Sequence, residues 1–171
     1  MIGRSFLQPE RSPAAAVGQL PKKLLVPVVQ SPASMEALAV ACAIAKVQRG
    51  TSVHVVHVIE VLRSLPLTAE METEAQYGEL VLRRAADLAS QLECRVTTEL
   101  LQARDAGIAI VEEAERIGAD AIVLGVGYKR LIGEFQTGRT VEYVFRHAPC
   151  QVWLIRRELP KERRPGAGSE R

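Results

Sequence analysis

The sequence has little net charge and no long hydrophobic run. Twenty-two Lys and Arg residues nearly balance 20 Asp and Glu, which leaves a formal charge of +2. Such a balance provides no concentrated field to attract a nucleic acid or an anionic membrane. The longest apolar run, residues 37–45, is too short to cross a bilayer, and residues 1–21 lack the apolar segment of a secretory signal. We therefore expect a cytoplasmic protein with no nucleic-acid partner and no membrane insertion.

Cysteine and histidine are also scarce. The three cysteines, Cys42, Cys94 and Cys150, are widely spaced and form no C-x-x-C pair, so the pattern indicates reduced core thiols rather than a zinc site or a redox dithiol. His54 and His57 lie three apart in a predicted strand and therefore point to opposite faces. We expect no metal site.

Catalytic signatures are missing as well. The chain contains neither the G-x-S-x-G motif of a nucleophile elbow nor a G-x-x-x-x-G-K-(S/T) phosphate loop. With three histidines, no Ser-His-Asp or Cys-His arrangement can be assigned. We expect no catalytic residue and a protein that is not an enzyme.

The length and composition fit one domain with two tails. A chain of 171 residues that is 47% hydrophobic can form a single stable core. Residues 1–21 and 158–171 combine proline, glycine and charged residues without a sustained hydrophobic period, which is typical of flexible tails. The predicted domain is residues 22–157.

Within this domain, apolar strand patterns alternate with helical ones. Strands are predicted at residues 23–29, 51–61, 94–101, 121–125 and 151–156, and helices at 31–48, 69–92, 106–117 and 140–147. The alternation predicts an α/β fold of three layers, in which a five-stranded parallel sheet is flanked by about four helices.

Several residues mark the ends and the buried faces of these helices. Ser31 and Asp105 are predicted N-caps, and Gly118 is predicted to end the third helix. Ile108 in the third helix and Tyr143 and Phe145 in the fourth are expected to pack inward. His147 is expected to interact with the C-terminal dipole of its helix.

The segment from residue 124 to residue 150 carries the main candidate site. Ligands of open parallel sheets bind beyond the carboxyl ends of the strands, here after Val29, Ile59 and Gly125. The glycines Gly125, Gly127 and Gly138 allow close approach of the backbone, and the helix that follows supplies amide donors. Lys129, Arg130 and Arg139 add positive charge to this anion seat. In the alternative reading the glycines only permit tight turns and close packing, and the cations form a solvated surface.

Three segments, KLLVPVVQSPAS, GADAIVLG and GRTVEYVFRHAPCQVWLIR, resemble universal stress proteins in order and spacing, over residues 23–156. This resemblance implies the adenine nucleotide alpha hydrolase-like fold, a cytosolic location and a homodimer that pairs through the last strand around Trp153. It also implies ATP as the ligand of those members that carry a G-x2-G-x9-G-(S/T) loop.

The present loop departs from this pattern at three places. Gly125 and Gly138 match the outer glycines, whereas the middle glycine falls on Tyr128, with Gly127 one place early. Arg139 replaces the hydroxyl residue, although Thr140 follows and would cap the helix. Val29 stands where ATP-binding members carry an acidic residue, and it cannot accept the hydrogen bonds that a carboxylate would. The departures argue against tight ATP binding.

Three hypotheses follow. The first is a non-catalytic, dimeric stress-response or regulatory module, whose cleft is empty or takes an anionic small molecule held by Gly125, Gly127, Gly138, Arg139 and Thr140. The second is an ATP-binding member with weak or no ATPase activity, in which Gly127 and Thr140 replace the missing groups. The third, a nucleotide-transferring enzyme, needs catalytic residues that the sequence does not offer.

Overall fold

The computed structural model describes residues 20–127, 130–131, 134–135 and 138–156. Of the predicted tails, only residues 20 and 21 lie within this part. The elements, in chain order, are β1 (Lys23–Pro27), α2 (Pro32–Val47), β2 (Ser52–Glu60), α3 (Glu72–Gln91), β3 (Val96–Ala103), α4 (Ala106–Ile117), β4 (Ala121–Val126), β5 (Arg130–Leu131), β6 (Glu134–Phe135), α5 (Arg139–His147) and β7 (Gln151–Arg156).

Five strands form one parallel sheet in the order β3-β2-β1-β4-β7. The central strand β1 pairs with β2 on one side, where Val26 lies opposite Val55, and with β4 on the other, where Leu25 lies opposite Ile122. The middle of β1 and nearly all of β4 are buried, which is why these strands read as continuous apolar runs. The five-stranded parallel sheet with four main helices is thus confirmed.

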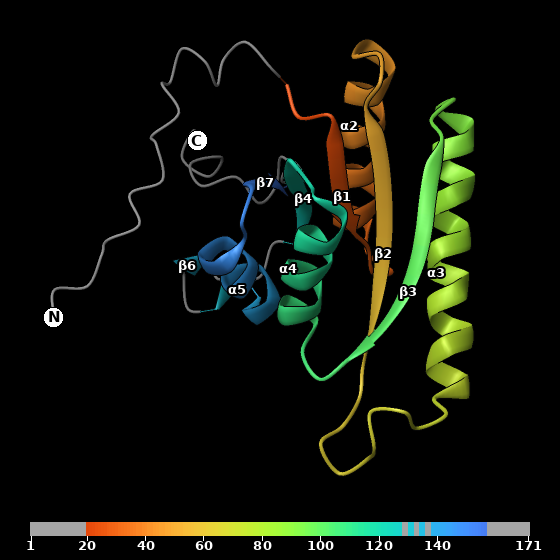
Figure 1. The fold of residues 1–171 in the computed structure, drawn as a ribbon, viewed down its shortest axis with the longest axis vertical. Helices are drawn as coiled ribbons and strands as arrows, with labels where there is room; N and C mark the ends of the chain where they lie inside the picture. Colours follow the sequence, from red (N-terminus) through yellow and green to blue (C-terminus); the bar gives the residue numbers. More distant parts are fainter. Residues whose placement is uncertain (1–19, 128–129, 132–133, 136–137, 157–171) are drawn as a thin grey trace, which may run out of the picture.

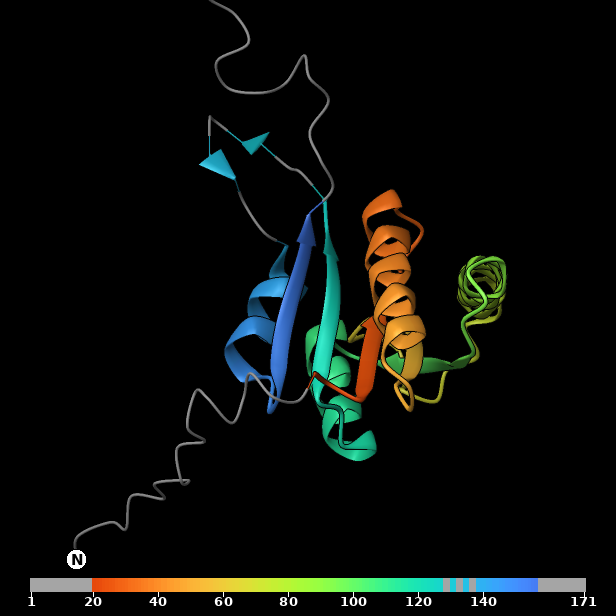
Figure 2. The ribbon, with the colours of Figure 1, turned by 90° about the horizontal axis from the view of Figure 1, so that it is seen from above.

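The helices cover the two faces of the sheet in pairs. Alternate residues of each strand enter two separate cores: Val26, Val55 and Val123 join the core under α2 and α3, whereas Leu25, Val56 and Ile122 join the core under α4 and α5. Figure 2 shows the resulting layers, with α4 and α5 on one side of the sheet and α2 and α3 on the other. Figure 1 labels the strands and helices of this arrangement.

The helix boundaries predicted from Ser31, Asp105 and Gly118 are confirmed. Ser31 is the N-cap of α2, and its side chain accepts a hydrogen bond from the Ser34 amide. Asp105 caps α4 by accepting from the amides of Gly107 and Ile108, at 2.8 and 3.3 Å. Gly118 ends α4 in the left-handed conformation, with φ of 62°.

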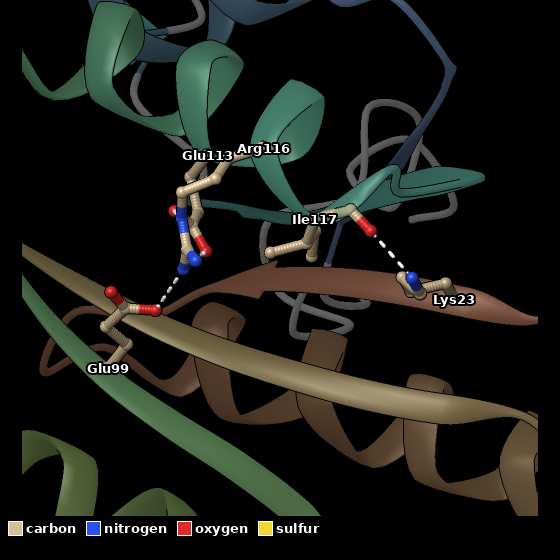
Figure 3. Close-up of polar contacts among 5 residues, drawn as sticks. All are labelled: Lys23, Glu99, Glu113, Arg116 and Ile117. Atoms are coloured by element: carbon tan, nitrogen blue, oxygen red, sulfur yellow. Dashed lines mark hydrogen bonds and ion pairs between the residues drawn. The ribbon is translucent and has the colours of Figure 1, made fainter.

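Polar contacts join α4 to β1 and to β3 (Figure 3). The Lys23 ammonium of β1 donates to the carbonyl of Ile117 at the end of α4, over 2.6 Å. The Asp120 carboxylate accepts from the amides of Lys22 and Lys23, both at 2.9 Å. These bonds fix the start of β1 against the turn between α4 and β4, as the electrostatics of a helix C-terminus favour.

Helix α4 also carries one nearly buried acidic residue, Glu113. Glu113 is only 4% exposed, and its carboxylate accepts two hydrogen bonds from the Arg116 guanidinium, each 2.6 Å. The same guanidinium donates to Glu99 of β3, also over 2.6 Å (Figure 3). Arg116 therefore neutralises a carboxylate that burial would otherwise destabilise.

Some details of the prediction were wrong. Ile108 is exposed, because the buried face of α4 runs instead through Ala109, Ile110, Val111 and Ala114. Phe145 is 65% exposed, whereas Tyr143 packs partly against the core. The short antiparallel pair of β5 and β6 was not predicted either. It stands clear of the layers at the end toward which β4 and β7 point (Figure 2).

The cysteines are free, but only Cys42 is a core thiol in the full sense. Cys42 is buried, whereas Cys94 and Cys150 are half-buried at the edges of the two cores. Burial raises the pKa of the Cys150 thiol, and the nearby Asp120 carboxylate raises it further.

Candidate functional site

The candidate site lies between two neighbouring strands, β1 and β4, whose following helices pack on opposite faces of the sheet. The helix that follows β1 packs in the α2/α3 layer, whereas the helix that follows β4 packs in the α4/α5 layer. Because β1 and β4 are neighbours in the sheet, the loops after them diverge to opposite faces. This divergence is the topological switch point at which open parallel sheets bind ligands.

The exit of β1 is held in one conformation by short polar contacts. The amide of Val29 donates to the Ser34 hydroxyl over 3.3 Å, and the Ser31 amide donates to the Val29 carbonyl over 2.7 Å. The buried His57 ring donates from Nδ1 to the Val28 carbonyl, over 2.8 Å. These contacts leave the Val29 side chain 53% exposed at the site.

His57 is therefore a structural residue. It lies on the face of β2 that α3 covers, where Gly78 allows the helix to approach and the Tyr77 ring packs edge-on at 5.9 Å between centroids. A Cβ atom at Gly78 would lie 2.8 Å from the imidazole. The bond from Nδ1 fixes the tautomer of the ring, and His54, three residues earlier, belongs to the opposite face.

Gly125 has a packing role that the structure makes explicit. A Cβ atom at this position would lie 2.2 Å from the carbonyl oxygen of Ala33 and 2.6 Å from the amide of Ser34. The first turn of α2 thus rests directly on the end of β4. Close packing against α2 is therefore enough to explain a glycine at this position, and no ligand contact is needed.

Gly127 and Gly138 are different. A Cβ atom at either residue would meet no atom within 4 Å. Gly138 has φ of −69° and ψ of 156°, an extended conformation that any residue adopts. Neither crowding by the described residues nor, at Gly138, backbone strain explains these two glycines, so the space beside them is open to a ligand.

The N-terminus of α5 faces this open space. Gly138 is the N-cap of α5 and offers no side chain to the first amides of the helix. Arg139 is the first residue of the helix and is 81% exposed; its Nε lies 3.9 Å from the Asp105 carboxylate, a distance at the limit of an ion pair. The guanidinium thus remains available to an anion beside the positive end of the helix dipole. Thr140 was predicted to cap this helix, which is wrong, because Thr140 already lies within α5.

Two acidic side chains near this edge accept hydrogen bonds from backbone amides at the start of α4. Glu60, at the end of β2, accepts from the Ala106 amide over 2.9 Å, and Asp105 caps the same helix. Sequence reasoning missed the role of Glu60. Its position at the carboxyl end of a strand was the available signal.

Other predicted site residues are placed only in part. Tyr128 and Lys129 lie outside the described residues, and Arg130 is described only as the start of β5. Among the described residues, Gly127 follows the end of β4, and Gly138, Arg139 and Thr140 lie consecutively at the start of α5. The structure assigns Gly125 to the packing of α2.

A pocket that was not predicted lies to one side of this site. It encloses about 280 Å³ between the start of α2 and the middle of α3. None of the predicted site residues lines it. Its walls are Gln30, Ser31, Pro32, Met35, Val81 and Arg84.

Within residues 20–127, 130–131, 134–135 and 138–156, no group of three or more His, Cys, Asp or Glu side chains is arranged to hold a metal ion. In the same residues no helix combines the length and the hydropathy needed to cross a membrane.

The sequence and the fold both match known proteins. The Universal stress protein family matches residues 21–156. A universal stress protein of Methanocaldococcus jannaschii is 30% identical over 142 residues, which cover 80% of this chain and 82% of that protein. The structure of the universal stress protein from Archaeoglobus fulgidus superimposes with a TM-score of 0.66 at 22% identity, over 78% of this chain and 97% of that one. The structure of the universal stress protein from Archaeoglobus fulgidus in complex with dAMP superimposes with a TM-score of 0.62 at 22% identity, over 78% of this chain and 96% of that one.

The structural matches are too distant in sequence to indicate more than a shared fold. The family match, by contrast, covers residues 21–156, and the Methanocaldococcus jannaschii relative is similar over most of its own length. The chain therefore belongs to the universal stress protein family.

Proposed function

We propose that this protein is a non-catalytic, dimeric regulatory module of the cytoplasmic stress response, whose site binds a small phosphate-bearing ligand of the nucleoside monophosphate class. The observation that carries the proposal is the open space at Gly127 and Gly138, beside a helix N-terminus without a side-chain cap. Backbone amides and the exposed guanidinium of Arg139 would hold the phosphate there.

A monophosphate fits these residues better than ATP for two reasons. Val29 supplies no carboxylate at the end of β1, and its exposed apolar side chain cannot accept a hydrogen bond. The predicted second anchor of a triphosphate loop is not glycine but Tyr128. The complex of the Archaeoglobus fulgidus protein with dAMP supports a monophosphate as the probe to test first.

The binding experiment is a calorimetric titration of the full chain with AMP, adenosine, inorganic phosphate and ATP with magnesium. We expect saturable binding of AMP, none of adenosine at the same concentration, and at least tenfold weaker binding by Arg139→Ala, since a charge-assisted contact contributes about 1.5–3 kcal/mol. Arg146→Ala is the matched control, because Arg146 lies on the same helix and pairs with Glu142 over 2.7 Å.

Each alternative has its own result. Equal affinity for AMP and adenosine would contradict a phosphate seat. Binding of ATP ten times tighter than that of AMP would favour the second hypothesis, an ATP-binding member. Release of phosphate from ATP by the protein, above the rate of the buffer, would contradict the non-catalytic part of the proposal.

The dimer is proposed from the position of β7. This strand forms one edge of the sheet and pairs only with β4 among the described strands, so its outer backbone groups are available to a second copy. Leu154 is exposed, and Trp153 is partly buried at the same edge. Pairing of β7 with its copy would satisfy the free backbone groups and cover Leu154.

Light scattering at micromolar concentration tests the dimer. We expect twice the chain mass of 18.7 kDa for the wild type and a shift toward monomer for Leu154→Arg. Phe145→Arg is the control, because Phe145 is exposed on α5 rather than on the edge strand. A monomer mass for the wild type would contradict the proposal.

A further inference from the structure

Two cysteines that are far apart in the sequence meet on the α2/α3 side of the sheet. Cys42 lies in α2 within the buried core, and Cys94 follows α3 and packs against the same core. Burial, followed by a hydrogen bond to the Cys94 side chain, raises the pKa of the Cys42 thiol. Fifty-one residues separate them along the chain, and these residues include β2 and α3.

Neighbouring contacts hold this arrangement on both sides. Lys46, one turn after Cys42 on α2, forms an ion pair of 2.5 Å with Glu93, the residue before Cys94. The backbone at Glu93 adopts φ of 58°, which turns the chain sharply after α3. The Cys94 amide donates to the Ala89 carbonyl over 2.9 Å, so the position of Cys94 is tied to the end of α3.

We infer that Cys42 and Cys94 form a site of reversible oxidation, in which a peroxide converts the two thiols to an intramolecular disulfide. Neither the family resemblance nor the proposed ligand site involves these residues. Cys42 lies in α2 and Cys94 in the turn between α3 and β3, so the bond would attach α2 covalently to that turn.

The two cysteines take different parts in the reaction. The half-buried Cys94 is the one that a peroxide reaches, whereas Cys42 is 1% exposed. The Cys94 thiolate attacks one peroxide oxygen, the O–O bond breaks, and the released hydroxide takes up a proton to give water and a sulfenic acid at Cys94. The Cys42 sulfur then attacks the Cys94 sulfur, the S–O bond breaks, and the departing hydroxide leaves as water with the proton of Cys42.

The balance of the two steps is complete. Two thiols lose two electrons and two protons, and hydrogen peroxide is reduced to two molecules of water. Burial, followed by the contact with Cys94, raises the pKa of the Cys42 thiol to about 12. Cys42 is thus a thiol rather than a thiolate at neutral pH, so the second step is expected to be the slower one.

The test uses the full chain after reduction and removal of the reductant. Treatment with a small excess of hydrogen peroxide, followed by intact mass spectrometry, is expected to show a loss of 2 Da for the wild type, a value that follows from two lost hydrogens. Tryptic mapping without reduction should then join the peptides of Cys42 and Cys94. The Cys150→Ser variant should behave in the same way, because Cys150 lies against the core on the other face of the sheet.

Single variants separate a thiol pair from a lone reactive cysteine. Cys42→Ser should accumulate a dimedone adduct at Cys94, whereas Cys94→Ser should give neither the adduct nor the loss of 2 Da. Circular dichroism melts of each variant show that it is folded. Dithiothreitol should restore the reduced mass of the wild type, and the oxidised form should unfold at higher urea concentration than the reduced form.

Three results would overturn the inference. One is stable sulfenic or sulfinic acid at Cys94 in the wild type without a link to Cys42. A second is a disulfide that involves Cys150, and a third is full retention of three free thiols under conditions that oxidise a reference dithiol.

Discussion

Substitution of Gly125 by alanine should destabilise the protein far more than the same change at Gly138. At Gly125 the added Cβ would lie 2.2 Å from the Ala33 carbonyl oxygen and 2.4 Å from its carbon, whereas contacts below 3.0 Å essentially never occur in proteins. The first turn of α2 would have to retreat from β4 by about 1.2 Å to restore an ordinary contact of 3.4 Å.

The first turn of α2 resists that movement. Its N-cap hydroxyl on Ser31 accepts from the Ser34 amide over 3.2 Å and donates to the Ser34 hydroxyl over 3.0 Å, and the Val29 amide donates to the same hydroxyl. Overpacking against a fixed backbone costs about 1–3 kcal/mol, and we expect the upper part of that range, about 2–3 kcal/mol. For a chain of this size that corresponds to a decrease in Tm of roughly 5–10 °C.

The matched control has the opposite expected sign. Gly138 has an extended backbone and open space, so alanine there reduces only the freedom of the unfolded chain and should raise stability by about 0–1 kcal/mol. Valine at Gly138 should leave Tm within about 2 °C of the wild type and still weaken AMP binding, since it fills the proposed phosphate seat.

The assay is urea unfolding followed by circular dichroism, at one protein concentration for all variants because a dimer makes the midpoint depend on concentration. A Gly125→Ala protein as stable as the wild type would refute the close approach of α2 to β4. A Gly138→Val protein that binds AMP normally would refute the ligand role of that glycine without affecting the packing argument.

Three further predictions concern residues outside the ligand site. Burial raises the pKa of the Cys42 thiol from 9.0 to about 12, so on raising the pH the unfolded chain loses this proton before the folded chain does. The contribution of the thiol to the free energy of unfolding is therefore present below pH 9 and falls by about 1.4 kcal/mol per pH unit above it. Urea unfolding between pH 8 and 10.5 should show a steeper decline of stability for the wild type than for Cys42→Ala. Arg116→Met should lower Tm more than Glu99→Gln, because only the first leaves the nearly buried Glu113 carboxylate without its guanidinium; equal melts would show that Glu113 does not need its partner. Arg104→Met should increase tryptic cleavage after Arg63 by severalfold, since Arg104 donates to the carbonyls of Val61, Leu62 and Leu65 and fixes that loop, and unchanged digestion kinetics would contradict this role.

The order and type of the main elements were readable from local patterns. Ser31 before Pro32, and Asp105 before an apolar helix ending at Gly118, each specify a helix boundary through contacts within a few residues. The apolar runs of β1 and β4 indicated strands buried on both faces, and such burial requires the parallel arrangement that the structure shows. These features depend on hydrogen bonds and hydrophobic periodicity that short segments carry by themselves.

The position of the site at the carboxyl ends of β1 and β4 stays a prediction, and one detail of it was wrong. The carboxyl ends of β1 and β4 follow from topology, yet the expected capping role of Thr140 was wrong because the helix begins one residue earlier, at Arg139. Ile108 and Phe145 were assigned to the core from hydrophobicity, whereas only the angular position of each residue on its packed helix decides exposure. Boundary shifts of one residue are enough to change such an assignment.

The sequence by itself thus determined the family, the order of the elements and the parallel sheet. The tertiary structure alone showed that Gly125 accommodates the backbone of α2 while Gly127 and Gly138 face open space, because identical residues differ only in what distant segments bring against them. The packing of Cys42 and Cys94 against one core and the burial of Glu113 beside Arg116 were likewise decided by tertiary packing. Contacts between residues far apart in sequence depend on how the helices pack on the sheet, and no local pattern encodes that geometry.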